Sequence, residues 1–298
     1  MNDAPPASYL LRPQPEDPRL TRRMSGLDQE GKPVETAVVV ERPLTLFLNG
    51  QEIVTMMTIG DYPDYLAVGY LINQNMLAAD DRIVGIDYDE ELETVVVRTA
   101  RATNFERKLK KKTLTSGCAQ GTVFGDLMER FDEVELPKDA VLKTSWIYSL
   151  SKQINLTPSL YLAAGAIHGC CLCEEDRPLV YMEDVGRHNA IDKIAGYMRL
   201  QGISAADKLF YTTGRLTSEM VIKTVQMGIP ILISRSGFTA WGVELARKAD
   251  LTLIGRAKGK RFVALSGERR LLFDADPKAA AEESPRHARK SSLSDDGE

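Results

Sequence analysis

The feature that most constrains the fold is a regular alternation of strand-like and helix-like segments in the second half of the chain. Apolar runs such as KLFYTTG and IPILISRSG are each followed by apolar residues at helical spacing, as in LTSEMVIKTVQMG and TAWGVELARKA. Strands and helices that alternate at this length favour an α/β fold, with helices on both faces of a sheet. We therefore predict an α/β domain over residues 136–274.

Within that domain, SLYLAAGAIHGCCLCEED and PLVYME predict two further strands, and RHNAIDKIAGYMRLQG predicts a helix. LTLIGRAKGKRFVALS continues the alternation.

The first half of the chain predicts a smaller α+β region at residues 34–135. VETAVVVERPLTLFLNGQEIVTMMTI indicates two strands joined at Asn49-Gly50, a dipeptide that suits a tight hairpin turn. YPDYLAVGYLINQNML and TVFGDLMERFDEV predict helices, and IVGIDYDEELETVVVRTA predicts a second strand pair. Residues 1–33 and 275–298 are rich in proline or charge and have little to bury, so we predict disorder there.

Composition excludes several classes of protein. A net charge of −4 argues against a dedicated nucleic-acid binder, which normally carries a basic surplus. The N-terminus lacks the apolar block of a secretory signal, and no apolar run reaches membrane-spanning length. Four cysteines in 298 residues do not form the dense framework of a disulfide-rich domain. We expect a cytoplasmic protein with reduced thiols and with neither nucleic acid nor membrane as a partner.

Cys118 lies in the stretch KKKTLTSGCAQGTVFGD, after a cluster of basic residues and before a predicted helix start. Positive charge and a helix N-terminus both favour the thiolate form of a cysteine. Gly117 and Gly121 permit a tight loop and a close approach of a ligand to the backbone. A turn cysteine beside a solvated basic segment explains the same residues, and the local sequence leaves that alternative open.

A second cysteine cluster, His168-Gly-Cys170-Cys171-Leu-Cys173, suggests a zinc site. The segment is strand-like, however, and alternation along a strand sends Cys170 and Cys171 to opposite faces. Free cysteine behaves as a small buried hydrophobic residue, so we predict core packing for these three thiols and no metal site. His168 lies where the strand meets a possible pocket.

The segment EDVGRHNAIDK packs acids, an arginine, a histidine and an asparagine around Gly186 at a predicted strand-to-helix junction. Such junctions present side chains and helix N–H groups to ligands at the edge of an α/β sheet. The alternative is that Asp184 or Asn189 caps the helix while Arg187 pairs locally.

Two other junctions, TTGRLTSE and SRSGFTAWG, end a strand with small hydroxylated residues, a glycine and an arginine. This arrangement suits phosphate binding at a helix N-terminus, although neither segment is a P-loop or a dinucleotide fingerprint. GRAKGKR brings four basic residues into a loop with glycine, which would clamp an anion if it lies over a pocket. A solvated hairpin tip is the alternative.

Taken in order, these segments resemble the FdhD family of formate dehydrogenase accessory sulfurtransferases. The resemblance rests on GYLINQNML, SGCAQGT, GAIH, EDVGRHNAIDK, TTGRLTSEMVIKTVQMGIPILISRSG and VELARKADLTLIGRAKGKRF, and spans about residues 36–272. It implies a cytidine deaminase-like three-layer α/β/α domain with a smaller α+β portion formed by the N-terminal region.

The resemblance also implies a function. Family members accept persulfide sulfur from a cysteine desulfurase and pass it to the molybdenum or tungsten bis-pterin guanine dinucleotide cofactor, which then enters the catalytic subunit of formate dehydrogenase. We therefore expect a homodimeric sulfurtransferase that binds this cofactor as cargo and needs no metal of its own.

The persulfide cysteine of the family corresponds to Cys118, and the pocket histidine corresponds to His168. By the same resemblance, the cofactor-binding residues are Arg256, Ala257, Lys258, Gly259, Lys260, Arg261, Gly214, Arg215 and Ser234. A persulfide carrier needs an accessible sulfur with a low pKa, and a dinucleotide cofactor needs basic loops for its phosphates, so the residues suit both roles.

Many family members carry a Cys-x-x-Cys pair here, whereas this chain has Cys118 followed by Ala119, Gln120 and Gly121. The missing second thiol keeps a different hypothesis open, in which the protein is a non-catalytic chaperone that binds the cofactor. A zinc-dependent nucleobase deaminase is a third hypothesis, but the chain lacks the His-x-Glu and Pro-Cys-x-x-Cys motifs of those enzymes.

Overall fold

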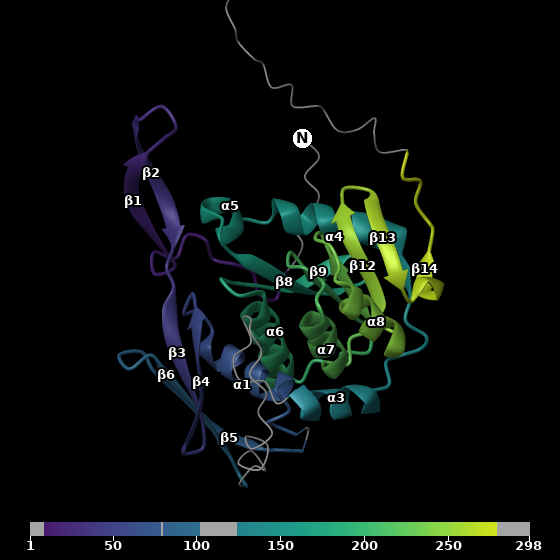
Figure 1. Cartoon of the computed structure of the whole chain (residues 1–298), viewed down its shortest axis with the longest axis horizontal. Coiled ribbons are helices and arrows are strands. Elements are labelled where there is room, and N and C mark those ends of the chain that lie inside the picture. The colour runs from purple at the N-terminus through teal and green to yellow at the C-terminus, as the bar shows by residue number, and fades with distance from the viewer. Residues whose placement is uncertain (1–8, 79, 102–123, 279–298) are drawn as a thin grey trace, which may run out of the picture.

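The computed structural model of the chain describes residues 9–78, 80–101 and 124–278. Its largest element is a six-stranded sheet with the order β13-β12-β11-β10-β8-β9 (Figure 1). The strands are β8 (His168–Glu174), β9 (Arg177–Asp184), β10 (Lys208–Thr212), β11 (Ile231–Ser234), β12 (Thr252–Lys258) and β13 (Arg261–Ser266). The neighbours β10, β11 and β12 run parallel, whereas β8, β9 and β13 pair antiparallel.

Helices cover both faces of this sheet. One face packs against α6 (Arg187–Gln201), α7 (Ser218–Gln226) and α8 (Ala240–Lys248), and the other packs against α4 (Thr144–Leu156). Along β8, Cys170 and Leu172 point to the first face, and Cys171 and Cys173 point to the second. The predicted α/β class is confirmed, and so is the prediction that neighbouring cysteines of this strand face opposite sides.

The N-terminal region forms a separate four-stranded sheet with the order β4-β3-β6-β5. Its strands are β3 (Arg42–Leu48), β4 (Gln51–Thr58), β5 (Ile83–Asp89) and β6 (Thr94–Thr99). The predicted hairpin at Asn49-Gly50 joins β3 to β4, and Asn49 takes the left-handed conformation (φ 55°) that such a turn requires. This sheet packs on α1 (Pro63–Asn73) around a core of its own.

The two parts meet through α1 and α6, which approach at two glycines. A Cβ atom on Gly69 would overlap the backbone carbonyl of Asp192, and one on Gly196 would overlap that of Tyr65. The close approach of the two helix backbones therefore requires glycine at both positions. It fixes the N-terminal sheet against the large sheet.

The structure corrects the prediction that the whole of SLYLAAGAIHGCCLCEED is a strand. Residues Leu160–Ala164 form a short helix, α5, and the strand starts only at His168. Ser159 caps α5 by accepting a hydrogen bond from the N–H of Leu162, a local contact that an apolar run does not reveal. The helix α4 at Thr144–Leu156 was not among the predicted elements.

The prediction of disorder over residues 1–33 is wrong for residues 21–27. These residues form β1 (Thr21–Leu27), which pairs antiparallel with β2 (Pro33–Val39) in a hairpin that projects from the body of the molecule (Figure 1). Most of its side chains are exposed, which agrees with the low apolar content that suggested disorder.

The remaining elements are α3 (Phe124–Glu133), β7 (Leu142–Lys143), a short 3-10 helix (Glu268–Arg270) and β14 (Leu271–Leu272). From the sequence, α3 was predicted to belong to the smaller α+β region at residues 34–135. In the structure, its buried Phe131 packs with α7 in the core of the large sheet.

Candidate functional site

The candidate site lies at one edge of the large sheet, where the parallel strands β10, β11 and β12 end at Thr212, Ser234 and Lys258. The N-termini of α6, α7 and α8 lie at the same edge, since each helix follows one of these strands or β9. In open α/β sheets, ligands bind outside the carboxyl ends of the strands, so this edge is where the fold predicts a ligand.

A cavity of about 1040 Å³ opens at this edge beside the β12–β13 hairpin. Five basic residues line it: Arg235, Arg256, Lys258, Lys260 and Arg261. The rest of the described lining consists of Tyr148, Tyr161, Thr213, Ser236, Gly237, Phe262, Val263, Phe273, Ala275 and Pro277. No acidic side chain is among them, so the basic groups give the cavity a positive potential that suits a phosphorylated ligand.

Aromatic rings hold two of the basic groups in place. The guanidinium of Arg235 lies 5.4 Å from the ring centroid of Tyr161 and also donates to Asn155 Oδ1 at 3.2 Å. Lys260 Nζ lies 5.5 Å from the ring centroid of Tyr148. Both distances allow cation–π attraction, which orients each charge without neutralising it. The charges therefore remain available to an anion.

Hydrogen bonds connect the loop after β10 to the loop after β11, next to the cavity. Ser234 Oγ donates to the carbonyl of Gly214 at 2.6 Å and accepts from the N–H of Ser236 at 2.9 Å. Arg256 adopts a positive φ of 55°, and its N–H donates to the carbonyl of Ser236 at 2.7 Å. This contact fixes the backbone that carries Arg256 at the mouth of the cavity.

The predicted binding residues therefore divide into three groups. Arg256, Lys258, Lys260 and Arg261 lie together on the cavity wall. Ser234 and Gly214 are outside the lining, and their hydrogen bond connects the loops after β10 and β11. Gly259 forms the hairpin turn with a positive φ of 59°. Ala257 is fully buried in the core on the α4 side, and its side chain does not face the cavity.

His168 and Arg215 lie at the same edge of the sheet but outside this lining. Burial lowers the pKa of His168, and the nearby positive charges of Arg187 and Arg215 lower it further. The imidazole is therefore neutral at pH 7. Gly214 lies against Arg187, because a Cβ atom at position 214 would be 3.0 Å from the Arg187 Cδ.

The polar segment EDVGRHNAIDK forms a different cavity, of about 380 Å³, between β4 and the start of α6. His188 and Lys223 both line it. Lys223 Nζ donates to both carboxylate oxygens of Asp192, at 2.8 and 2.7 Å, and His188 Nε2 lies 3.0 Å from Glu219 Oε2. Burial lowers the pKa of His188 although Glu219 opposes the shift.

The alternative reading of this segment as helix caps is wrong. The N-cap residue of α6 is Gly186, and no side chain caps the helix; among the backbone N–H groups at this end of α6, Asp184 Oδ1 accepts only from that of Gly186 itself, at 3.3 Å. Asn189 Nδ2 donates to Asp184 Oδ1 at 3.0 Å and to the carbonyl of Met57 at 2.7 Å. These contacts connect the large sheet to β4 of the N-terminal sheet.

Cys118 lies outside the described residues, so its predicted role stays a prediction. The other three cysteines are buried and free. Burial raises the pKa of Cys170 to about 12 and raises that of Cys171 well above its usual range. Neither is a thiolate at neutral pH, so neither suits nucleophilic chemistry. Among the described residues, no group of three His, Cys, Asp or Glu side chains is arranged to hold a metal ion.

Sequence reasoning missed the aromatic wall of the large cavity. Tyr148 comes from α4 and Tyr161 from α5, the two helices that the sequence did not predict. Arg235 lies in the quoted segment SRSGFTAWG, but it was not among the predicted binding residues. Its basic charge at a strand end was the available signal. No helix in the described part of the chain is both long and apolar enough to cross a membrane.

Several known proteins are similar to this chain in sequence. A sequence model of the FdhD/NarQ family matches residues 39–272. The chain is 31% identical to the sulfur carrier protein FdhD of Wolinella succinogenes, covering 76% of this chain and 80% of that protein. It is 30% identical to the protein of the same name from Bacillus subtilis, covering 77% and 88%.

A solved structure is also similar. It carries the name of a formate dehydrogenase accessory protein from Desulfotalea psychrophila and is 26% identical to this chain. The match has a TM-score of 0.68 and covers 85% of this chain and 98% of that one.

Proposed function

The chain belongs to the FdhD/NarQ family, and on that premise we propose that it is a sulfur carrier required for formate dehydrogenase activity. In this proposal, a cysteine desulfurase supplies the sulfur, and the acceptor is the molybdenum or tungsten bis-pterin guanine dinucleotide cofactor before its insertion into the catalytic subunit. The observation that carries the proposal is the cavity with five basic residues and no acidic one in its described lining.

The cavity suits the phosphates of such a cofactor. Arginine and lysine form charge-assisted hydrogen bonds to phosphate oxygens, and the hairpin supplies four such groups from Arg256, Lys258, Lys260 and Arg261. Tyr148 and Tyr161 offer aromatic surface for the flat ring systems of the same molecule. Ser234, Gly214, Gly259 and Ala257 hold the loops that present these groups, and His168 and Arg215 extend the site along the sheet edge.

Cys118 carries the sulfur in this proposal. Its thiolate attacks the outer sulfur of the donor persulfide, the sulfur–sulfur bond of the donor breaks, and the donor cysteine leaves as a thiolate. In the second step, the acceptor supplies an electron pair to the outer sulfur of Cys118, and Cys118 leaves as a thiolate with the electron pair of the broken bond. The five basic residues within 107–112 favour the thiolate in both steps.

The proposal includes finer features that come from the family resemblance. These are the sulfurtransferase activity itself, a homodimer, a location in the cytoplasm and a large domain similar to that of cytidine deaminases. The three-layer arrangement of α4, the six-stranded sheet and α6–α8 supports the last of these.

A second candidate function is a non-catalytic chaperone for the same cofactor. The observation that favours it is the single cysteine of the segment SGCAQGT, with Gly121 where many family members carry a second thiol. Both functions use the basic cavity, and they differ in whether Cys118 is needed.

Incubation of the purified protein with a cysteine desulfurase and cysteine tests the proposal, with intact-protein and peptide mass spectrometry as the readout. We expect a mass gain of one sulfur atom on the peptide that contains Cys118, and no gain in the Cys118→Ala variant. The Cys173→Ala variant is the matched control and should gain sulfur as the wild type does. A protein that stays unmodified would favour the chaperone.

A further inference from the structure

One wall of the large cavity lies outside the part of the chain that the family model matches. That match ends at residue 272, yet Phe273, Ala275 and Pro277 belong to the cavity lining. The strand β14, which pairs parallel with β7, brings the chain to this place. Residues 273–277, the C-terminal wall, therefore supply lining that the matched region does not.

Asp274 attaches the C-terminal wall to the start of α4. Its Oδ1 accepts from the N–H of Ser145 at 2.9 Å, and its Oδ2 accepts from Oγ of Ser145 at 2.6 Å. The N–H groups of Asp274 and Ala275 both donate to Oγ1 of Thr144, at 3.2 and 3.3 Å. Because α4 also carries Tyr148 of the cavity lining, the wall has a fixed position relative to that ring.

The attachment holds at neutral pH. The hydrogen bonds from Ser145 lower the pKa of Asp274 to about 2, so its carboxylate is charged. A negative charge is favoured at a helix N-terminus, where the first backbone N–H groups have no partner within the helix. The C-terminal wall therefore stays bound to α4 under the conditions in which a ligand binds.

Phe273 carries the free aromatic ring of the cavity. It is 79% exposed, the largest fraction among the large apolar residues that the structure describes. The other aromatic rings of the lining have partners, since Tyr161 contacts Arg235 and the ring centroids of Tyr148 and Phe262 lie 6.4 Å apart. Within residues 9–78, 80–101 and 124–278, Phe273 has no such ring or cation contact.

Single exposed apolar residues are common on protein surfaces. Phe273 differs from them because its backbone is fixed beside a cavity whose basic groups suit phosphates. A ring without a polar atom cannot bind a phosphate, but it can stack on a flat base that is joined to the phosphates.

We propose that Phe273 stacks on the base of a purine nucleotide whose phosphates bind the basic residues of the cavity. The inference rests on the proposed function, in which this cavity holds a guanine dinucleotide cargo. It assigns the two halves of the ligand to different groups, the phosphates to the β12–β13 hairpin and the base to the C-terminal wall. Every base has a flat face, so stacking adds affinity for a base without selecting guanine.

The test is isothermal titration calorimetry of the full chain with guanosine diphosphate and with inorganic pyrophosphate, which has the two phosphates and no base. We expect Phe273→Ala to weaken the affinity for guanosine diphosphate about tenfold and to leave that for pyrophosphate unchanged. Asp274→Ala should act in the same direction, because it removes the bonds that attach the wall to α4.

Phe273→Trp supplies a spectroscopic readout. Tryptophan keeps a flat stacking surface, so this variant should bind guanosine diphosphate at least as tightly as the wild type. Its added fluorescence should fall with guanosine diphosphate and not with pyrophosphate, and the wild type, with Trp146 and Trp241, gives the background. A merely structural role of Phe273 would not produce this difference.

Leu156→Ala is the matched control. Leu156 is also a large apolar residue, 70% exposed, and it ends α4 outside the described lining of the cavity. Its replacement removes apolar surface of similar exposure, and the variant should bind both ligands as the wild type does.

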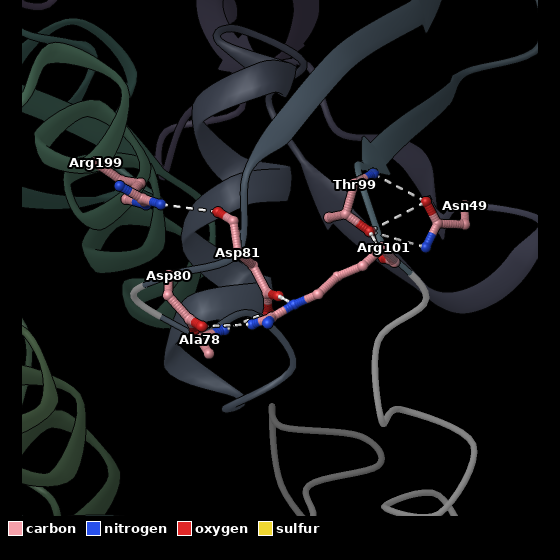
Figure 2. Close-up of polar contacts among 7 residues, drawn as sticks. All are labelled: Asn49, Ala78, Asp80, Asp81, Thr99, Arg101 and Arg199. Atoms are coloured by element: carbon pink, nitrogen blue, oxygen red, sulfur yellow. Dashed lines mark hydrogen bonds and ion pairs between the residues drawn. The ribbon is translucent and has the colours of Figure 1, made fainter.

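A second control removes a charged contact in another part of the structure. Arg101 donates from Nε to Asp81 Oδ1 at 2.8 Å and from Nη2 to Asp80 Oδ2 at 2.7 Å (Figure 2). None of these three residues belongs to the described lining. Arg101→Gln should therefore leave both affinities unchanged, which separates a loss of stacking from a loss of structure elsewhere.

The inference is overturned if Phe273→Ala binds guanosine diphosphate as the wild type does, or if its affinity for pyrophosphate falls in parallel. Failure of the proposed function looks different, because the wild type would then bind neither ligand, and the inference would fall with it.

Discussion

Lys193 Nζ lies 2.5 Å from Asp184 Oδ2, and both side chains are fully buried. Asp61, from the loop before α1, also contacts Lys193 at 2.5 Å, and Thr58 donates to Asp184 at 2.5 Å. Burial lowers the pKa of Lys193, but Asp184 and Asp61 outweigh burial, so the net shift is upward. This lysine joins the N-terminal sheet to the edge of the large sheet where the candidate site lies.

Replacement of Lys193 by Met should therefore be strongly destabilising. The variant leaves the buried Asp184 and the partly buried Asp61 without a counter-charge, and loss of one partner of a buried ion pair typically costs about 3–5 kcal/mol. Urea unfolding measures the loss. The control is Lys248→Met, since Lys248 and its partner Asp132 are both about half exposed, and such a pair contributes at most about 1 kcal/mol. Equal losses in the two variants would contradict a joining role for Lys193.

Gly69→Ala should separate α1 from α6. The added methyl group would overlap the backbone of Asp192, which cannot move independently of its helix. We expect a loss of about 1–3 kcal/mol in the free energy of unfolding, as for other overpacked cores. Gly85→Ala is the control, because the nearest atom to its added Cβ is the end of the Arg98 side chain at 3.9 Å. A Gly69→Ala variant as stable as the control would refute the close approach.

The buried carboxyl of Glu183 should make the free energy of unfolding depend on pH. Burial raises its pKa to about 7 from an ordinary value of 4.5, although hydrogen bonds from the N–H groups of Leu160 and Tyr161 oppose the shift. Between those values the folded protein binds more protons than the unfolded chain, so this group lowers stability as the pH rises towards 7.

In Glu183→Gln this dependence is removed. Relative to the wild type, the variant should gain up to ~3 kcal/mol in the free energy of unfolding between about pH 4 and about pH 8. The change with pH is the readout, since the lost acceptor oxygen adds a constant cost. A difference between the two proteins that stays constant over this range would contradict the shift.

Charge reversal in the large cavity should weaken nucleotide binding. Lys258→Glu and Arg261→Glu each place a negative charge on the wall, and we expect each to weaken the affinity for guanosine diphosphate about tenfold or more. Isothermal titration calorimetry measures the affinity. Lys152→Glu, an exposed α4 position outside the described lining, is the control for net charge. Equal weakening by all three would show a nonspecific charge effect and not a site.

The sequence predicted the parts of the structure that follow from local pattern. The order of strands and helices from His168 to Ser266 follows from hydrophobic periodicity, and the opposite directions of Cys170 and Cys171 follow from strand geometry. The grouping of Arg256, Lys258, Lys260 and Arg261 on one cavity wall follows from their closeness in the chain.

The rest depends on contacts between distant residues. Tyr148 and Tyr161 join Arg235 at the cavity only because α4 lies on one face of the sheet, and the apolar run LYLAA does not distinguish a short helix from a strand. The contact of Lys193 with Asp61 spans 132 residues, and no local pattern specifies it.

Formate dehydrogenase activity in a deletion strain is the most direct test of the central claim, that Cys118 carries sulfur to the cofactor of this enzyme. The strain is complemented with the wild type, with Cys118→Ala or with Cys173→Ala as the matched cysteine control. The account predicts activity with the wild type and with Cys173→Ala, and none above the uncomplemented strain with Cys118→Ala. Full activity with Cys118→Ala would contradict it.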